Sequence, residues 1–141
     1  MTMTDAVLVK TIYIKSSREK VWAYLTEGKK LARWFHEADC DLVTPGKDYA
    51  LLMESGSKGC WGKILEVEPP NRLVYTFTHD WLKGYETQVE WILRDVDGGT
   101  QLTMNHTGLD RSKADPFAML SDHDKGWDEH LQRLRMVAGT A

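Results

Sequence analysis

The 141 residues are close to the commonest length of a single domain, and 42% hydrophobic with 28% charged residues is an ordinary globular composition. The net charge of −3, with lysine and arginine scattered among acidic residues, argues against nucleic-acid binding, and no apolar run is long enough to span a bilayer. We therefore expect one domain over residues 1–141, with a core of about 6–138.

The N-terminus and the cysteines indicate the compartment. Residues 1–5 show no basic segment followed by an apolar stretch, so no secretory signal is predicted and a cytoplasmic location is expected. Cys40 and Cys60 form no C-x-x-C pair, which predicts two free thiols rather than a disulfide framework or a thiolate metal site.

The first quarter of the chain predicts a strand followed by two short helices. Residues 6–15 are rich in β-branched side chains and alternate in the manner of a strand. Ser16, with Glu19 three residues later, has the spacing of a capping box, so a helix is expected to begin there. Gly28 interrupts this helix, and residues 29–35 predict a second helical turn.

The middle of the chain predicts antiparallel strands joined by hairpins. Alternation of apolar and polar residues is clearest in 85–94, where Tyr85 and Trp91 belong to the apolar set and Glu86 and Glu90 to the polar set. Turn residues such as Pro45-Gly46 separate the segments. The expected strands cover residues 39–43, 48–54, 60–68, 72–79, 85–94 and 100–106.

The C-terminal segment predicts a long helix. Apolar residues at 127, 131, 134 and 137 recur at helical spacing, with Ser121 or Asp122 as the expected N-cap and Gly139 at the end. An antiparallel sheet with one apolar face needs a cover, and this helix is the longest element available. The expected fold is α+β, with a curved antiparallel sheet wrapped around the C-terminal helix in the order β-α-α-β-β-β-β-β-β-α.

Several local strings carry a resemblance to a known family. They are 18–22 (REKVW), 31–35 (LARWF), 62–76 (GKILEVEPPNRLVYT), 99–103 (GTQLT) with 106–109 (HTGL), and 126–127 (GW) followed by Leu131 and Leu134. In this order they run over nearly the whole chain and resemble the activator-of-heat-shock-ATPase branch of the START-like (SRPBCC) superfamily. The resemblance implies a helix-grip fold with a cavity suited to hydrophobic ligands, and no universal catalytic residue.

Two departures from the family pattern qualify what the resemblance implies. Relatives often carry Ala-Pro where this chain has Ser16-Ser17. The eukaryotic activators also carry an N-terminal chaperone-binding domain that is not expected here. A contact with a chaperone, or with a second copy of the chain, is therefore kept as an alternative partner behind a small hydrophobic ligand.

The histidines do not predict a metal centre. His123 and His130 lie seven residues apart, roughly two helical turns, but no H-E-x-x-H motif or His–carboxylate pair completes a ligand set. No nucleophile motif or phosphate-binding loop occurs either. We expect no catalytic residue, no metal and no cofactor, although His106 is a candidate acid–base group if the domain is a cyclase or dehydratase.

The leading hypothesis is a binding domain for a small apolar or aromatic molecule, desolvated in an internal cavity with few orienting hydrogen bonds. Ordinary core packing is the alternative reading for each aromatic residue taken alone. The second hypothesis is an enzyme that uses the same cavity, and the third is a chaperone-ATPase activator. The residues expected to line the cavity are Trp34, Met53, Trp61, Tyr75, Phe77, His79, Tyr85, Trp91, Met104, His106, Trp127, Leu131 and Leu134.

Overall fold

The structure is a computed structural model that describes residues 7–111 and 115–139. Its strands are β1 (Val7–Ile14), β2 (Glu37–Ala38), β3 (Asp48–Leu52), β4 (Lys58–Glu68), β5 (Arg72–His79), β6 (Thr87–Val96) and β7 (Gly99–Thr107). Its helices are α1 (Arg18–Thr26), α2 (Gly28–Leu31) and α3 (Pro116–Ala138), with short 3-10 turns η1 (Asp80–Leu82) and η2 (Leu109–Arg111).

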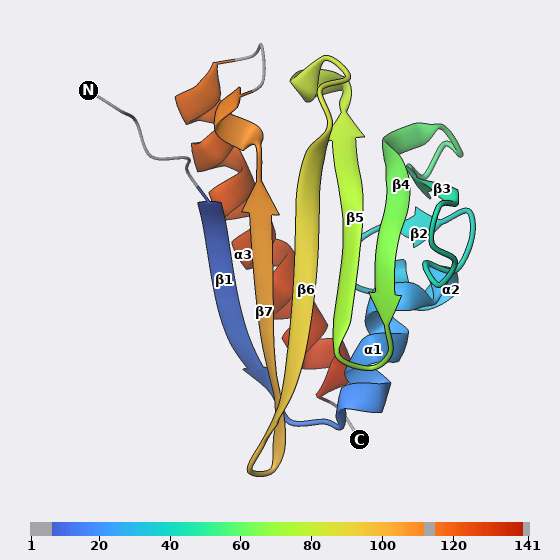
Figure 1. The fold of residues 1–141 in the computed structure, drawn as a ribbon, viewed down its shortest axis with the longest axis vertical. Coiled ribbons are helices and arrows are strands. Elements are labelled where there is room, and N and C mark those ends of the chain that lie inside the picture. The colour runs from blue at the N-terminus through green and yellow to red at the C-terminus, as the bar shows by residue number, and fades with distance from the viewer. Residues whose placement is uncertain (1–6, 112–114, 140–141) are drawn as a thin grey trace.

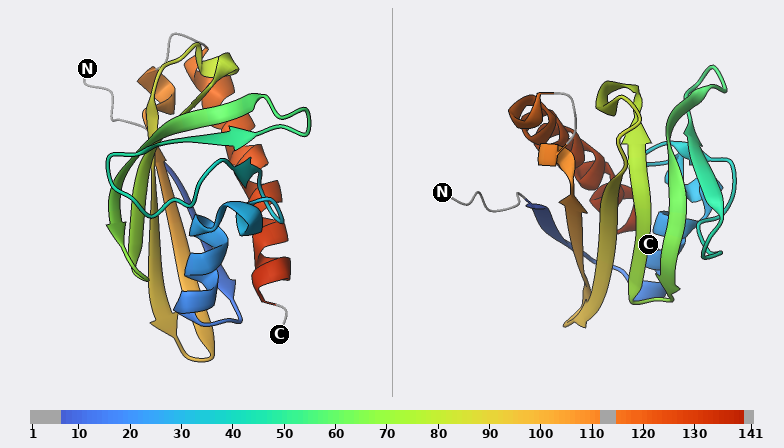
Figure 2. Two further views of the ribbon diagram at one scale, coloured as in Figure 1. Left: turned by 90° about the vertical axis from the view of Figure 1, so that its right-hand side faces the viewer. Right: turned by 45° about the horizontal axis from the view of Figure 1, so that its top comes forward.

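The seven strands form one curved antiparallel sheet in the order β1-β7-β6-β5-β4-β3-β2. The long helix α3 crosses behind this sheet in Figure 1, and the left view of Figure 2 shows α1 and α3 on the same side of it. The predicted α+β helix-grip fold and its element order are confirmed.

Strand alternation places the core between the sheet and α3. Tyr75, Trp91 and Met104 are buried on neighbouring strands, and Leu131 and Leu134 of α3 are buried with them. The hydroxyl of Tyr75 accepts a hydrogen bond from Trp91 Nε1 at 2.9 Å, so this polar pair is satisfied inside the core.

Two element boundaries differ from the sequence prediction. The strand expected at 39–43 is wrong: β2 is two residues long and ends at Ala38, because the chain then turns to hydrogen-bond Leu42 N to Thr26 O at the end of α1. The last helix begins at Pro116 rather than near Ser121. Proline suits the first helical turn because its missing N–H would have no partner there.

The N-terminal helices are shifted slightly from their predicted limits. The N-cap of α1 is Ser17, not Ser16, and its hydroxyl accepts from Lys20 N at 3.2 Å. Helix α2 ends at Leu31, and the chain continues through a turn to Phe35 instead of a longer helix. This turn is relevant to function because it brings Phe35 and His36 over the end of the sheet.

The cap of α3 gives a direct stability prediction. Asp115 accepts a hydrogen bond from Ala118 N at 3.1 Å and satisfies one of the free N–H groups of the first turn. Asp115→Ala is expected to lower the free energy of unfolding by about 1 kcal/mol. Urea denaturation measures this, with the exposed Asp122→Ala on the same helix as the control. Equal effects of the two variants would contradict the capping role.

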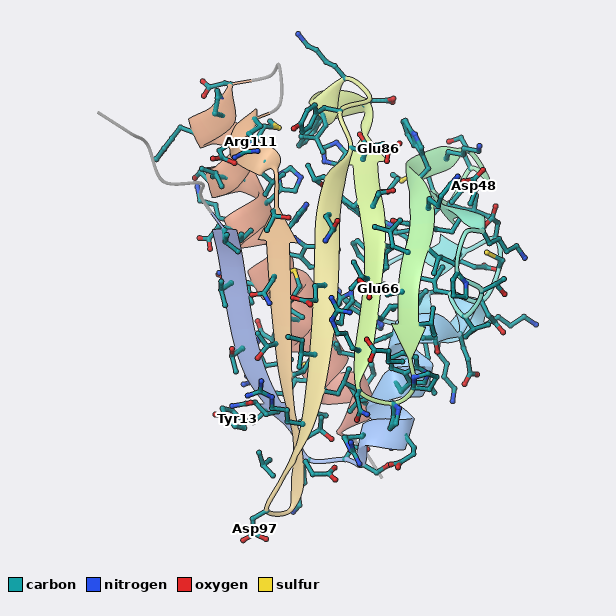
Figure 3. All side chains as sticks on the ribbon, in the orientation of Figure 1. Tyr13, Asp48, Glu66, Glu86, Asp97 and Arg111 are labelled. Atoms are coloured by element: carbon teal, nitrogen blue, oxygen red, sulfur yellow. The ribbon has the colours of Figure 1, made fainter. Side chains whose placement is uncertain are left out.

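Polar contacts hold the sheet from both faces. On the face turned away from α3, Arg72 donates to Glu66, Glu68 and Glu90 at 2.7–3.0 Å, and Figure 3 labels Glu66 there. On the other side, Lys10 of β1 lies 2.8 Å from Asp128 of α3 and also pairs with Asp124. The ion pairs of Lys10 fasten the helix to the edge strand.

Among the described residues, no helix is both long and apolar enough to span a membrane.

Candidate ligand-binding site

A pocket of about 550 Å³ opens at the end of the sheet that carries η1, the upper end in Figure 1. It lies between the turn after α2, the β3–β4 hairpin, the end of β5, η1 and the N-terminal half of α3. Its volume falls within the range of about 300–1,000 Å³ that is usual for small-molecule sites. The lining residues are Phe35, His36, Met53, Ser57, Lys58, Gly59, Cys60, Phe77, His79, Asp80, Trp81, Asp122, His123, Gly126, Trp127 and His130.

Three aromatic rings from three separate elements form what we call the aromatic floor of the pocket: Phe35, Phe77 and Trp127. The ring centroids of Phe35 and Phe77 are 6.3 Å apart and nearly parallel. Trp127 lies 5.3 Å from Phe35 and 6.1 Å from Phe77. Aromatic side chains in mutual contact offer a large, rigid apolar surface to a ligand.

Two apolar side chains at the rim are left in solvent. Trp81 of η1 is 69% exposed and Met53 at the end of β3 is 47% exposed. A large exposed apolar side chain at the edge of a pocket marks surface that a ligand would cover. Trp81 also touches His79, with ring centroids 6.1 Å apart.

Gly126 leaves open space in the wall. It lies within α3, where glycine costs about 0.5–1 kcal/mol relative to alanine. A Cβ atom built on Gly126 would meet no other atom within 4 Å, so packing does not require glycine there. Glycine at this position therefore makes the helix less stable than alanine would, and it leaves the pocket wider than a side chain would.

His79 and His123 face each other across the pocket wall, with their Nε2 atoms 2.8 Å apart. His123 Nδ1 lies 2.6 Å from the carbonyl oxygen of Met119, which only accepts, so this nitrogen carries a proton. In neutral His123 the Nε2 atom is then an acceptor, and His79 must donate to it. This leaves the Nδ1 atom of His79 as an acceptor without a hydrogen-bond partner among the described residues.

The hydrogen bonds of His130 also fix which of its ring nitrogens carries the proton. Its Nδ1 atom lies 2.7 Å from the Nη2 atom of Arg133, and because arginine only donates, this nitrogen is an acceptor. The carbonyl oxygen of Trp34 is farther from the same nitrogen, at 3.3 Å, and already accepts from Arg133 Nε. Neutral His130 therefore carries its proton on Nε2, which has no hydrogen-bond partner among the described residues.

His106 lies beneath the aromatic floor and is 0% exposed. Thr87 donates its hydroxyl proton to Phe77 O at 2.6 Å, so His106 Nε2 must donate to the Thr87 oxygen at 2.7 Å. The other nitrogen, Nδ1, accepts from Trp127 Nε1 at 3.0 Å. Both ring nitrogens are engaged, and His106 fixes the position of Trp127 from below.

Burial lowers the histidine pKa values around the pocket. It lowers the pKa of His79 to about 4, with a further contribution from His123, and that of His130 to about 4, with a further contribution from Arg133. Burial also lowers the pKa of His36 and His123, and holds that of His106 well below its ordinary value. At neutral pH the imidazoles of the wall are therefore uncharged.

Neither nucleophilic nor metal chemistry is indicated by the wall. Burial raises the pKa of the Cys60 thiol to about 12, so at neutral pH it is not a thiolate. Within residues 7–111 and 115–139, no three histidine, cysteine or carboxylate side chains are grouped so that they could hold a metal ion.

The structure brings four of the sequence-predicted residues to the pocket: Met53, Phe77, His79 and Trp127. Tyr85 is half-buried before β6 and does not line it. Cys60 and His79 are paired across β4 and β5, and both line the pocket. Trp61 and Thr78 form the next pair, and because successive side chains point to opposite faces, Trp61 lies on the other face of the sheet. The others, which are buried in the core, are Trp34, Tyr75, Trp91, Met104, His106, Leu131 and Leu134.

Several residues that line the pocket are not among those predicted from the sequence. His123 and His130 flank Trp127 at positions i−4 and i+3, so all three share one face of α3. That spacing is visible in the sequence and could have identified them. Phe35, His36 and Trp81 lie in turns, whose position over the sheet no periodic pattern reports.

Comparison with known families decides the relationship of this chain. The family model described as Activator of Hsp90 ATPase homolog 1-like protein matches residues 15–139. The chain belongs to this family. The match covers every element that lines the pocket, from the turn after α2 to α3. Among curated protein sequences, none matches this chain.

Several solved structures of the same fold are similar to this member of the family. The crystal structure of CalU16 from Micromonospora echinospora is 26% identical with a TM-score of 0.76, covering 94% of this chain and 75% of CalU16. DynU16, a putative protein in the dynemicin biosynthetic locus, is 22% identical with a TM-score of 0.78, covering 94% of this chain but 47% of DynU16.

A third similar structure is the Aha1 dimer from Colwellia psychrerythraea, which is 18% identical with a TM-score of 0.77. The match covers 95% of this chain and 96% of that one. At this identity the likeness shows the fold alone.

Proposed function

We propose that this protein binds a small apolar or aromatic molecule in the pocket above the aromatic floor. The observation that carries the proposal is the pocket itself, which has a volume of about 550 Å³, has aromatic or imidazole rings on half of its lining residues, and is left open at Gly126. Pockets of this size with an apolar lining and a few polar groups are the usual form of small-molecule sites.

Affinity would come mainly from removing the ligand's apolar surface from water. At about 25 cal/mol per Å², burial of roughly 200 Å² contributes about 5 kcal/mol, from which the cost of immobilising the ligand must be subtracted. The uncharged imidazoles add orientation without the desolvation cost of a buried charge.

The relatives are consistent with a small-molecule role. DynU16, which shares the fold, is described as a putative protein of a biosynthetic locus. The family description also names an ATPase activator, which supports the alternative that the domain activates a chaperone ATPase. Copurification of a chaperone with stimulated ATP hydrolysis would favour that alternative over ligand binding.

An enzymatic role in the same pocket would need a histidine other than His106. That side chain is sealed below the floor, and both of its ring nitrogens are engaged by Thr87 and Trp127. A cyclase or dehydratase reaction would have to use an imidazole that reaches the pocket, such as His79.

Gly126 provides the test of the binding proposal. Gly126→Leu is expected to fill the pocket and weaken binding of an uncharged apolar fluorescent probe such as N-phenyl-1-naphthylamine at least tenfold, because a branched side chain occupies the open space. The variant should keep its fold, since leucine favours helix more than glycine does. Probe titration and mass spectrometry of small molecules released on denaturation measure the two effects.

Gly126→Ala is the matched control. It is expected to raise the free energy of unfolding by about 0.5–1 kcal/mol while it leaves most of the pocket open. Equal probe affinity in the wild type, the alanine variant and the leucine variant would contradict binding in this pocket. Loss of a natively bound compound only in the leucine variant would place that compound there.

A further inference from the structure

His79 and His130, two of the four histidines that line the pocket, are not equivalent in hydrogen bonding. His79 offers an acceptor, its Nδ1 atom, because its proton is committed to His123. His130 offers a donor, its Nε2–H group, because Arg133 donates to its other nitrogen. Buried polar side-chain atoms without a partner do not include these two, so each of them keeps some surface accessible to solvent. These two histidines therefore supply one free acceptor and one free donor.

These two groups lie on different sides of the aromatic floor. His79 contacts Phe77, with ring centroids 5.9 Å apart, whereas His130 contacts Phe35 at 4.6 Å and Trp127 at 6.2 Å. His123, the partner of His79, precedes His130 by seven residues on α3. At about 1.5 Å per residue, their positions on the helix are about 10 Å apart along its axis.

Trp127 lies between the two groups on the same helix face, as part of the floor. The combination is an apolar surface with an acceptor at one side and a donor at the other. A flat ring system that rests on the floor would meet both groups with its two ends.

We propose that the pocket selects an uncharged, flat aromatic molecule that carries a hydrogen-bond donor at the end near His79 and an acceptor, such as a carbonyl oxygen, at the end near His130. This inference rests on the proposed function and specifies the ligand class for the same pocket. A ligand with the opposite arrangement, or with no polar ends, would leave two wall groups unpaired.

The physical basis of this selection is the cost of unpaired polar groups. A site built to hydrogen-bond a ligand hydroxyl rejects the analogue that lacks it more strongly than an apolar pocket rejects a small change in size. When the ligand covers His79, water can no longer pair with its Nδ1 atom. A ligand without a donor therefore loses affinity there even if its apolar contacts are unchanged.

A series of naphthalenes tests the proposal with the purified full chain. The reference probe is 6-hydroxy-2-acetonaphthone, which has a hydroxyl donor at one end and a ketone acceptor at the other. Its methyl ether, 6-methoxy-2-acetonaphthone, lacks the donor, and 2-naphthol lacks the acceptor. Calorimetric titration is expected to give about tenfold weaker binding for each of the two incomplete probes than for the reference.

Variants of the two histidines assign each end of the ligand. His79→Phe is expected to reduce the difference between the hydroxyl and methoxy probes to less than about twofold. His130→Phe is expected to do the same for the difference between the reference probe and 2-naphthol. Tyr85→Phe is the control, because it also removes a hydrogen-bonding group but Tyr85 does not line the pocket, and it should retain both differences.

A ligand-free measurement tests the premise and does not depend on any variant folding. Nitrogen-15 correlation spectra of the histidine rings at neutral pH are expected to show the proton of His123 on Nδ1 and the protons of His79 and His130 on Nε2. A proton on Nδ1 of His79 would overturn the proposal.

The outcomes separate this inference from the proposed function. If all three probes bind with equal affinity and Gly126→Leu blocks them, the pocket binds apolar molecules but the donor–acceptor selection is wrong. If the three probes and unsubstituted naphthalene all fail to bind, the proposed function itself fails for aromatic ligands, and the selection fails with it.

Discussion

Replacement of Trp127 by alanine is expected to lower the free energy of unfolding by about 3–5 kcal/mol. Trp127 is 3% exposed and its ring contacts Phe35, Phe77 and Trp91 at centroid distances of 5.3–6.1 Å. Its removal would leave a cavity at the junction of α3, the sheet and the turn after α2. The surrounding rings come from rigid elements and could collapse into that space only in part.

The hydrogen bond from Trp127 to His106 adds to this cost. Loss of the indole N–H leaves His106 Nδ1 buried without its donor, at a cost of about 1–3 kcal/mol. Trp127→Phe separates the contributions, because it keeps an aromatic ring and removes only the donor and part of the volume. We expect its stability to lie between those of the wild type and the alanine variant.

Urea denaturation measures all three proteins, and Trp81→Ala is the matched control. Trp81 is 69% exposed, so the same substitution there is expected to cost less than about 1 kcal/mol. Similar losses of stability for Trp127→Ala and Trp81→Ala would show that the aromatic floor is not part of the core.

Acidification from about pH 7.5 to about pH 5 is expected to destabilise the fold strongly. Five histidines, at positions 36, 79, 106, 123 and 130, have folded-state pKa values below the ordinary value of 6.5. The unfolded chain therefore binds protons first as the pH falls through about 6.5. The stability that neutral histidines contribute is complete above this pH and is lost below it, down to the folded pKa values of about 4 for His79 and His130.

The magnitude is dominated by the buried residue. A histidine that stays neutral when folded and has an unfolded pKa of about 6.5 loses about 2 kcal/mol over this interval, which is the value expected for His106. Each of the four half-buried histidines contributes less, because solvent screens its environment. Arg133 next to His130 adds to the lowering of that histidine's pKa, whereas Asp80 next to His79 opposes the lowering there.

Denaturation midpoints at about pH 7.5, 6.5, 5.5 and 5 measure the effect. His106→Gln is the informative variant, because glutamine can donate to Thr87 and accept from Trp127 but does not titrate. It is expected to be less stable than the wild type at about pH 7.5 and to show a pH dependence smaller by about 2 kcal/mol. Equal stability of the wild type at the two ends of the range would contradict the neutral, buried state of these imidazoles.

The sheet and its inward face could be predicted from the sequence because alternation is a local signal. The range predicted for β5, 72–79, agrees with the structure, and Tyr75 and Phe77 point inward as expected. The short strand β2 could not be located, because a two-residue pairing leaves no periodic pattern. The start of α3 was placed late, because its first turn is mostly half-buried or exposed and lacks the apolar spacing of the later turns.

The pocket was harder to predict than the fold. Alternation places both His79 and His106 on the inward side of the sheet, but only the packing of Thr87 and Trp127 shows that His106 is covered and His79 is open. The same pattern gives buried Trp91 and Met104 an inward direction without showing that other side chains fill the space above them. The alternation in a sequence shows towards which face of the sheet a side chain points, whereas its access to a ligand depends on contacts between segments distant in the sequence.

The attachment of α3 to the edge strand has a consequence for how a ligand would reach the pocket. Lys10 of β1 pairs with Asp124 and Asp128, which belong to the same stretch of α3 that carries His123 and Trp127. We expect these ion pairs to keep α3 in place beside the pocket. A ligand would then enter and leave at the opposite rim, where Met53 and Trp81 are exposed. Residence time would then be governed by the β3–β4 hairpin and η1, while the floor beneath the ligand stays in place.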